Sequence, residues 1–162
     1  MKTFRLKGLR LLLEKDVEPE EERINMREGL VINREEEGWW LVEAVVDETA
    51  KTLFEDLLNN ETDVMMEVII SHENNDPATM VGRVRSTRPL ENGFAILIDS
   101  KMAMKKEDVF NYILDSLIAD GYTGDQLIEE FRNRKADNAS WSQQMARSLY
   151  EQYREKGSPL SR

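Results

Sequence analysis

The chain of 162 residues contains no cysteine and a single histidine, His72. Without cysteine it has no disulfide, no thiolate zinc site, no iron–sulfur cluster and no cysteine nucleophile. A transition-metal site would have to rest on carboxylates, which suit hard cations better. A chain without cysteine also fits a reducing compartment. The sequence therefore predicts a cytoplasmic protein that holds neither a metal nor a cofactor.

Long apolar runs and a surplus of positive charge are also missing. In the opening stretch, MKTFRLKGLRLLLEKD, charged residues and a glycine interrupt the apolar ones, so we expect neither a signal peptide nor a membrane span. The net charge is −10. Nucleic-acid binding depends on basic side chains that neutralise phosphates. We therefore expect no nucleic-acid partner and no membrane partner, and the mixed charges between 105 and 135 do not suit a DNA-reading helix.

Motifs for catalysis or phosphate binding are absent from the sequence. There is no phosphate-binding glycine loop and no GxSxG nucleophile motif. The segment that starts at Asp120 begins like a calcium loop, but its sixth position is Asp125 and its twelfth is Phe131. His72 follows an expected strand, where a lone histidine is usually a surface residue. We predict that the protein is not an enzyme, and a hydrolase would require carboxylates gathered around His72.

The first hundred residues follow the two-residue period of β-strands. After Gly8 the apolar positions of the first segment shift by one residue, which indicates a bulge or a bend. The acidic segment EPEEE, 18–22, is predicted to be a polar connection, and a short helix is expected near 49–59. Six or seven strands at short spacing predict an antiparallel β-barrel or a barrel-like sandwich. The expected strands lie within 3–15, 23–33, 39–48, 62–73, 79–88 and 94–99.

From about residue 104 the apolar residues follow a helical period of 3.6. Gly121 is a predicted helix C-cap, and Thr123 with Gln126 forms a predicted capping box. The sequence therefore predicts an α+β protein: a barrel core over 1–102, a helical pair or three-helix appendage over 103–157, and a flexible tail over 158–162. The segment ADNAS, 136–140, breaks the helical pattern. Three apolar groups carry the helical prediction: Val109, Phe110, Ile113, Leu114, Leu117 and Ile118, then Leu127, Ile128 and Phe131, and after the break Trp141, Met145, Leu149 and Tyr153.

Two adjacent tryptophans, in the stretch WWLVEAVV, point to opposite faces if that stretch is a strand. Trp40 shares its face with Val42, Ala44 and Val46, so this is the predicted core face. Trp39 shares the other face with Leu41, Glu43 and Val45. A tryptophan exposes roughly 150–250 Å² that burial removes from water. We therefore expect Trp39, Leu41 and Val45 to form an interaction face. The chain's own helices, a second copy or another protein could cover it, or it could stay partly exposed.

Three segments of the sequence resemble one family of small proteins. The opening MKTFRL, the segment EGLVIN and the strand WWLVEAVVD resemble the YwpF-like family of Bacillus-type bacteria. The resemblance implies a β-barrel followed by a helix pair, with a barrel similar to those of the Hcp-type tube proteins of type VI secretion. The family has no established activity, so the resemblance implies no functional residue.

Taken together, these features predict a non-enzymatic cytoplasmic protein that works through protein–protein contacts or self-association. The alternative is a barrel that binds a small ligand, with an inner pocket near Trp40, Met66 and Val84. The sequence alone leaves the partner, the ligand and the oligomeric state open.

Overall fold

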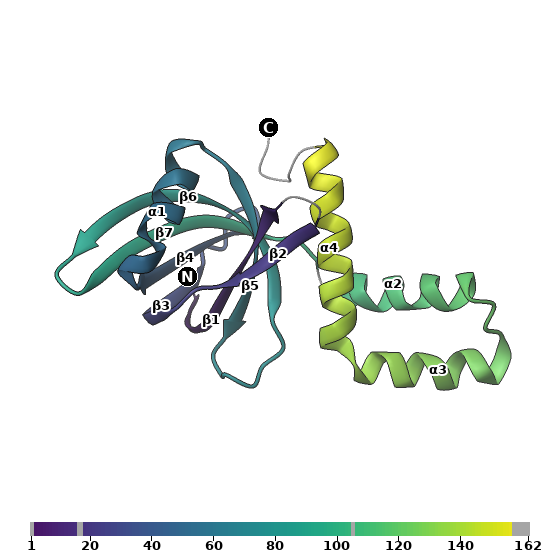
Figure 1. Ribbon diagram of the computed structural model, residues 1–162. Helices are drawn as coiled ribbons and strands as arrows, with labels where there is room; N and C mark the ends of the chain where they lie inside the picture. Colours follow the sequence, from purple (N-terminus) through teal and green to yellow (C-terminus); the bar gives the residue numbers. More distant parts are fainter. Residues whose placement is uncertain (1, 16–17, 105, 157–162) are drawn as a thin grey trace.

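The computed structural model describes residues 2–15, 18–104 and 106–156. Seven strands are followed by a group of three helices, and one further helix lies between β4 and β5 (Figure 1). The strands are β1 (Lys2–Lys15), β2 (Glu18–Arg23), β3 (Met26–Asn33), β4 (Trp39–Val46), β5 (Asp63–Ile70), β6 (Ala78–Leu90) and β7 (Gly93–Met102). The helices are the 3₁₀ turn η1 (Glu48–Ala50) and α1 (Lys51–Asn59), α2 (Lys106–Ala119), α3 (Gly124–Ala136) and α4 (Asn138–Lys156).

Six of the strands form a closed antiparallel barrel, which confirms the predicted α+β fold. The order around the barrel is β1-β3-β4-β7-β6-β5, and β5 pairs with β1 to close it. The register between β1 and β5 shifts at Gly8, as the change in apolar phase predicts. A Cβ atom at this position would lie 2.9 Å from Cδ1 of Ile69. Glycine at position 8 therefore lets the two strands approach closely at the bulge.

The prediction of a polar connection at 18–22 is wrong, because these residues belong to strand β2. β2 pairs with the second half of β1, from Arg10 to Lys15, and extends the sheet beyond the barrel. Intrinsic strand propensity does not predict β2, because glutamate and proline are depleted in strands. Such charges are tolerated here because β2 is the last strand in the sheet order, and charged side chains on an edge strand discourage pairing with other chains.

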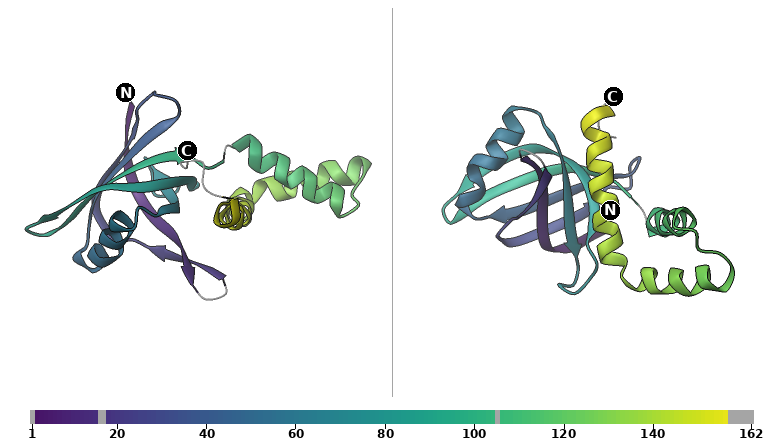
Figure 2. Two further views of the ribbon diagram at one scale, coloured as in Figure 1. Left: turned by 90° about the horizontal axis from the view of Figure 1, so that it is seen from above. Right: turned by 45° about the vertical axis from the view of Figure 1, so that its right-hand side comes forward.

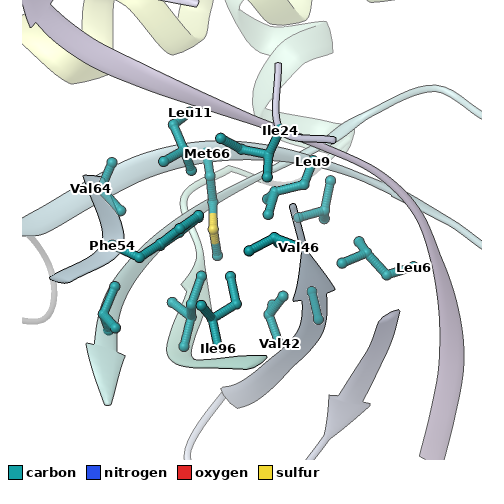
Figure 3. Close-up of a cluster of buried hydrophobic side chains, with 14 of the residues drawn as sticks. Leu6, Leu9, Leu11, Ile24, Val42, Val46, Phe54, Val64, Met66 and Ile96 are labelled. Carbon is teal, nitrogen blue, oxygen red and sulfur yellow. The ribbon is translucent and has the colours of Figure 1, made fainter. Parts of the chain in front are cut away.

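The barrel interior is filled by side chains from all six strands (Figure 3). Met66 and Val84 are buried in it, and Trp40 packs against it with its ring centroid 6.3 Å from that of Phe4. Helix α1 adds Phe54 to the same core. The predicted helix near 49–59 and the predicted core face of β4 are therefore confirmed.

Helices α2, α3 and α4 lie on the side of the barrel away from α1 (Figures 1 and 2). Helix α4 runs alongside the barrel, whereas α2 and α3 project from it as a hairpin. Gly121, with φ of +87°, ends α2 as predicted. Within the described ranges, no helix has both the length and the apolar composition needed to cross a membrane.

Two predictions for the helices are wrong in detail. The side chain of Thr123 makes no capping hydrogen bond, although this residue does precede α3. Ile118 is 65% exposed and does not share the buried face of Val109, Ile113 and Leu117. A helix stripe as wide as the predicted one cannot be buried whole by a single neighbouring layer. The barrel strands end at Met102 and α2 begins at Lys106. The division into domains stays a prediction, and the predicted tail lies outside the described residues.

Candidate interaction surfaces

A row of outward-facing residues runs around one end of the barrel across five adjacent strands. Trp39 of β4 lies opposite Lys101 of β7, and Lys101 lies opposite Val81 of β6. Val81 is paired in turn with Met65 of β5, and Met65 with Leu12 of β1. We call these five residues the belt. Their side chains face away from the interior because each strand alternates its two faces.

Helix α4 lies beside this side of the barrel, and residues of α2 and α4 form a second core together with residues of the belt (Figures 1 and 2). The cluster contains Leu12, Met65 and Val81 of the belt, and the helices bury four residues in it. Trp39 packs at the margin of this cluster, and Nζ of Lys101 lies 4.6 Å from the centroid of its ring. The chain's own helices therefore belong to the surroundings of Trp39. The four buried helix residues are Val109, Ile113, Leu117 and Ala146.

Leu41 and Val45 share the strand face of Trp39 but lie outside this second core. Leu41 is opposite Ile32 of β3 and Asp99 of β7. Val45 is opposite Glu28 of β3 and Ala95 of β7. Both side chains are half-buried. The structure thus separates Trp39, near the helices, from Leu41 and Val45, which lie farther along the bare strand.

Leu41 and Val45 instead belong to an apolar patch on the outside of β3, β4 and β7. Glu43 lies between them on β4, with Leu30 of β3 on one side and Leu97 of β7 on the other. Leu30 is 39% exposed, which makes it one of the most exposed large apolar residues of the described chain. Sequence reasoning missed Leu30 and Leu97, because it does not show which strands are neighbours. We call Leu30, Ile32, Leu41, Val45 and Leu97 the outer apolar patch.

A buried carboxylate lies beside the belt, beneath the helices. Glu67 of β5 is 3% exposed and lies opposite Arg10 of β1. Its Oε2 atom forms an ion pair with Nη2 of Arg10 at 3.1 Å. This contact does not count as a hydrogen bond, and no other described residue donates a hydrogen bond to Oε2. Nη1 of Arg10 is also 3.7 Å from Oε2 of Glu21. The sequence offers no signal for this site, because only the tertiary structure distinguishes one buried carboxylate among 32 acidic residues.

Burial raises the pKa of Glu67 above its ordinary value of 4.5. The positive charge of Arg10 opposes this effect, Glu21 adds to it, and Arg147 of α4 opposes it. The net shift is upward, so Glu67 holds its proton to a higher pH in the folded protein than in the unfolded chain. The pKa of this carboxyl therefore depends on β1, β2 and α4 as well as on its own strand.

The substitution Glu67→Gln is expected to change how stability depends on pH. In the unfolded chain Glu67 loses its proton near pH 4.5, and in the folded protein it loses it at higher pH. Between these two values the folded state binds more protons, so the free energy of unfolding falls as pH rises. Glutamine removes this fall. Urea unfolding of both proteins from pH 4.5 upward measures the difference, and parallel stability curves would contradict the prediction.

His72 is exposed in the turn after β5, where its backbone N–H donates to the carbonyl of Ile70. Among the described residues, no three side chains of His, Asp or Glu gather as a metal ion would require. The hydrolase hypothesis depended on carboxylates clustered around His72. The structure gives that hypothesis no such site within the ranges it describes.

Three pockets of the described chain open on its outer surface. A groove of about 700 Å³ lies where β1 and β3 separate, and its lining mixes four basic with three acidic side chains. Two others lie at the ends of β3 and β4. None of these three is lined by Trp40, Met66 or Val84, the residues of the predicted inner ligand pocket. Those three side chains pack in or against the barrel core.

Comparisons with known proteins identify relatives over most of the chain. A family model described as "YwpF-like protein" matches residues 2–134. The uncharacterized protein YwpF of Bacillus subtilis (strain 168) is 34% identical over 135 residues, which cover 83% of this chain and 99% of that protein. A crystal structure of a hypothetical protein from Staphylococcus aureus is similar with a TM-score of 0.59 and 26% identity. The similar region covers 85% of this chain and 94% of the chain from Staphylococcus aureus.

Proposed function

The chain belongs to the YwpF-like family, and on that premise we propose that it acts without catalysis, through contacts with other protein chains or with copies of itself. The observation that supports this function is the outer apolar patch. It extends over three adjacent strands on a part of the barrel that the second core of α2 and α4 does not include. A surface of this kind, with charged residues around it, is typical of protein interaction sites.

Charged residues at the border and in the middle of the patch would restrict the orientation and the chemistry of a partner. Asp99 lies opposite Leu41, and it interacts with Nη1 of Arg34 at 3.5 Å and Nη1 of Arg85 at 3.9 Å. Glu43, in the middle of the patch, is exposed. A partner would have to satisfy this carboxylate, because a buried charge without a partner is costly. The patch therefore suits a partner that brings a basic or hydrogen-bonding group to its centre.

Two further elements of the proposal rest on the sequence. A barrel similar to those of the Hcp-type tube proteins would favour self-association among the kinds of contact. A cytoplasmic location agrees with a chain that has no cysteine and so needs no oxidising compartment.

The substitution Leu30→Glu is expected to abolish the contact while leaving the fold intact. Leu30 is exposed enough to change without disturbing the core, and a charge at this position would make the patch costly to bury. The matched control is Ile128→Glu on α3, which adds the same charge at an apolar residue that is 50% exposed. Light scattering over a range of concentrations and capture of partners from cell extract would measure the contact. If both variants behave like the unmodified protein, the patch is not the binding surface.

A further inference from the structure

The junction between α3 and α4 contains neither of the two strongest helix-ending residues, glycine and proline. Asp137 is the single residue between the two helices, with φ of −100° and ψ of 49°. The surrounding sequence, RNRKADNAS, contains neither glycine nor proline. Helices commonly end at a glycine in the left-handed conformation or just before a proline. Asp137 and Asn138 are residue types that often begin a helix, so the local sequence permits a new helix here but does not by itself force the sharp bend.

The apolar face of α3 continues in phase into α4. At 100° per residue, Leu127, Phe131, Trp141, Met145 and Leu149 would fall within about a third of the circumference of one uninterrupted helix. In the structure all five are half-buried, and the last four belong to the second core. A break between two independent helices would not be expected to preserve this phase. The sequence thus favours one continuous helix as well as two separate ones.

Tertiary contacts hold the bend instead. Arg134 donates hydrogen bonds to Oγ of Ser116 at 2.9 Å and to Oδ2 of Asp120 at 3.1 Å, both near the end of α2. Its guanidinium group also lies 5.1 Å from the centroid of the Trp141 ring in α4. Beyond the bend, Met145 and Ala146 pack in the cluster that contains the belt. Docking of α4 on the barrel therefore stabilises the bent form. The barrel of a second copy of the chain offers α4 the same docking surface.

Helix α4 also lies beyond the part of the chain that defines the family. The family model ends at residue 134, three residues before the junction. The belt residues Leu12, Met65 and Val81 lie within it. The barrel, its outer belt, α2 and most of α3 thus lie within the span of the family model, and α4 follows α3 after the single residue Asp137.

We propose that α3 and α4 straighten at Asp137 into one helix and that each α4 docks on the belt of a second copy, giving a closed two-fold dimer. The helix would contain about 33 residues and span about 50 Å. Straightening gives up the contact between Arg134 and Trp141 across the bend, but α4 keeps its contacts with a barrel because the second barrel offers the same surface as its own. This inference rests on the self-association part of the proposed function and names the surface and the partner.

Substitutions at Asp137 test the exchange directly. Asp137→Ala favours a continuous helix and Asp137→Gly disfavours it. Because a dimer contains two junctions, the dissociation constants of these two variants should differ by roughly 30-fold. Four Gly/Ser residues inserted after Asp137 should shift the protein further toward monomer, because a long hinge lets α4 fold back on its own barrel. Light scattering over a dilution series, after refolding at each concentration, measures the dissociation constants.

The control is the same pair of substitutions at Ser148, an exposed residue within α4. Ser148→Ala and Ser148→Gly change the stability of α4 equally in both forms, so their dimer fractions should agree. A dimer whose dissociation constant is the same for all Asp137 variants would overturn the exchange. So would a monomer at every concentration for both the unmodified protein and Asp137→Ala. Capture of partners from cell extract by Leu30→Glu and by its control Ile128→Glu does not depend on the junction. That experiment therefore tests the proposed function separately from the exchange.

Discussion

Replacing Arg10 by methionine is expected to lower the free energy of unfolding by about 3 kcal/mol at neutral pH. Arg10 is the ion-pair partner of Glu67, which is 3% exposed, and the two side chains are 3.1 Å apart. Without Arg10 the carboxylate would be buried without its nearest compensating charge. Breaking a buried pair typically costs about 3–5 kcal/mol, and partial exposure of Arg10 places the expected loss at the lower end. Urea unfolding at pH 7 measures it.

Two comparisons separate the loss of charge compensation from the loss of packing. In the double variant Arg10→Met with Glu67→Gln, most of the loss should disappear, because no buried charge remains. The loss should also shrink as the pH falls toward 4.5, because the raised pKa lets more of the Glu67 side chains in the folded protein carry a proton there. Arg5→Met, at an exposed position on the same strand, should change stability by about 0.5 kcal/mol or less. If the double variant is as unstable as Arg10→Met, the ion pair does not explain the effect.

Replacing Phe54 by alanine is expected to cost about 3–5 kcal/mol, the usual range for a fully buried phenylalanine. Phe54 is 0% exposed and extends from α1 into the barrel core with Met66 and Val64 around it (Figure 3). Truncating it removes the contacts of a large ring and leaves a cavity that the closed sheet cannot collapse to fill. Urea unfolding followed by circular dichroism gives the change in stability.

The control for Phe54→Ala is Thr52→Ala, an exposed position on the same helix. Alanine has the higher helix propensity, so this variant should be as stable as the unmodified protein or slightly more stable. A loss below about 1 kcal/mol for Phe54→Ala would show that α1 is not part of the barrel core. It would also reopen the question of an internal space for a small ligand.

Local patterns in the sequence determined the classes of its elements. The change of apolar period from two to 3.6 separates the strands from the C-terminal helices, and the phase shift at Gly8 marks the bulge in β1. The alternation in WWLVEAVV places Trp40 toward the core. These features are local, because a side chain's face in a strand depends only on its neighbours along the chain. Strand β2 is the exception, since pairing with β1 overrides its unfavourable composition.

Only the tertiary structure decided which residues from different strands meet. The belt joins Trp39 to Leu12 through three other strands, and its register depends on closure of the barrel between β1 and β5. The same holds for the outer apolar patch and for Glu67, which is buried beside Arg10 of a different strand. The bend at Asp137 likewise occurs without a glycine or a proline, and contacts of α3 and α4 with other elements stabilise it. In each case the deciding energy comes from contacts between segments far apart in sequence, which no local pattern encodes.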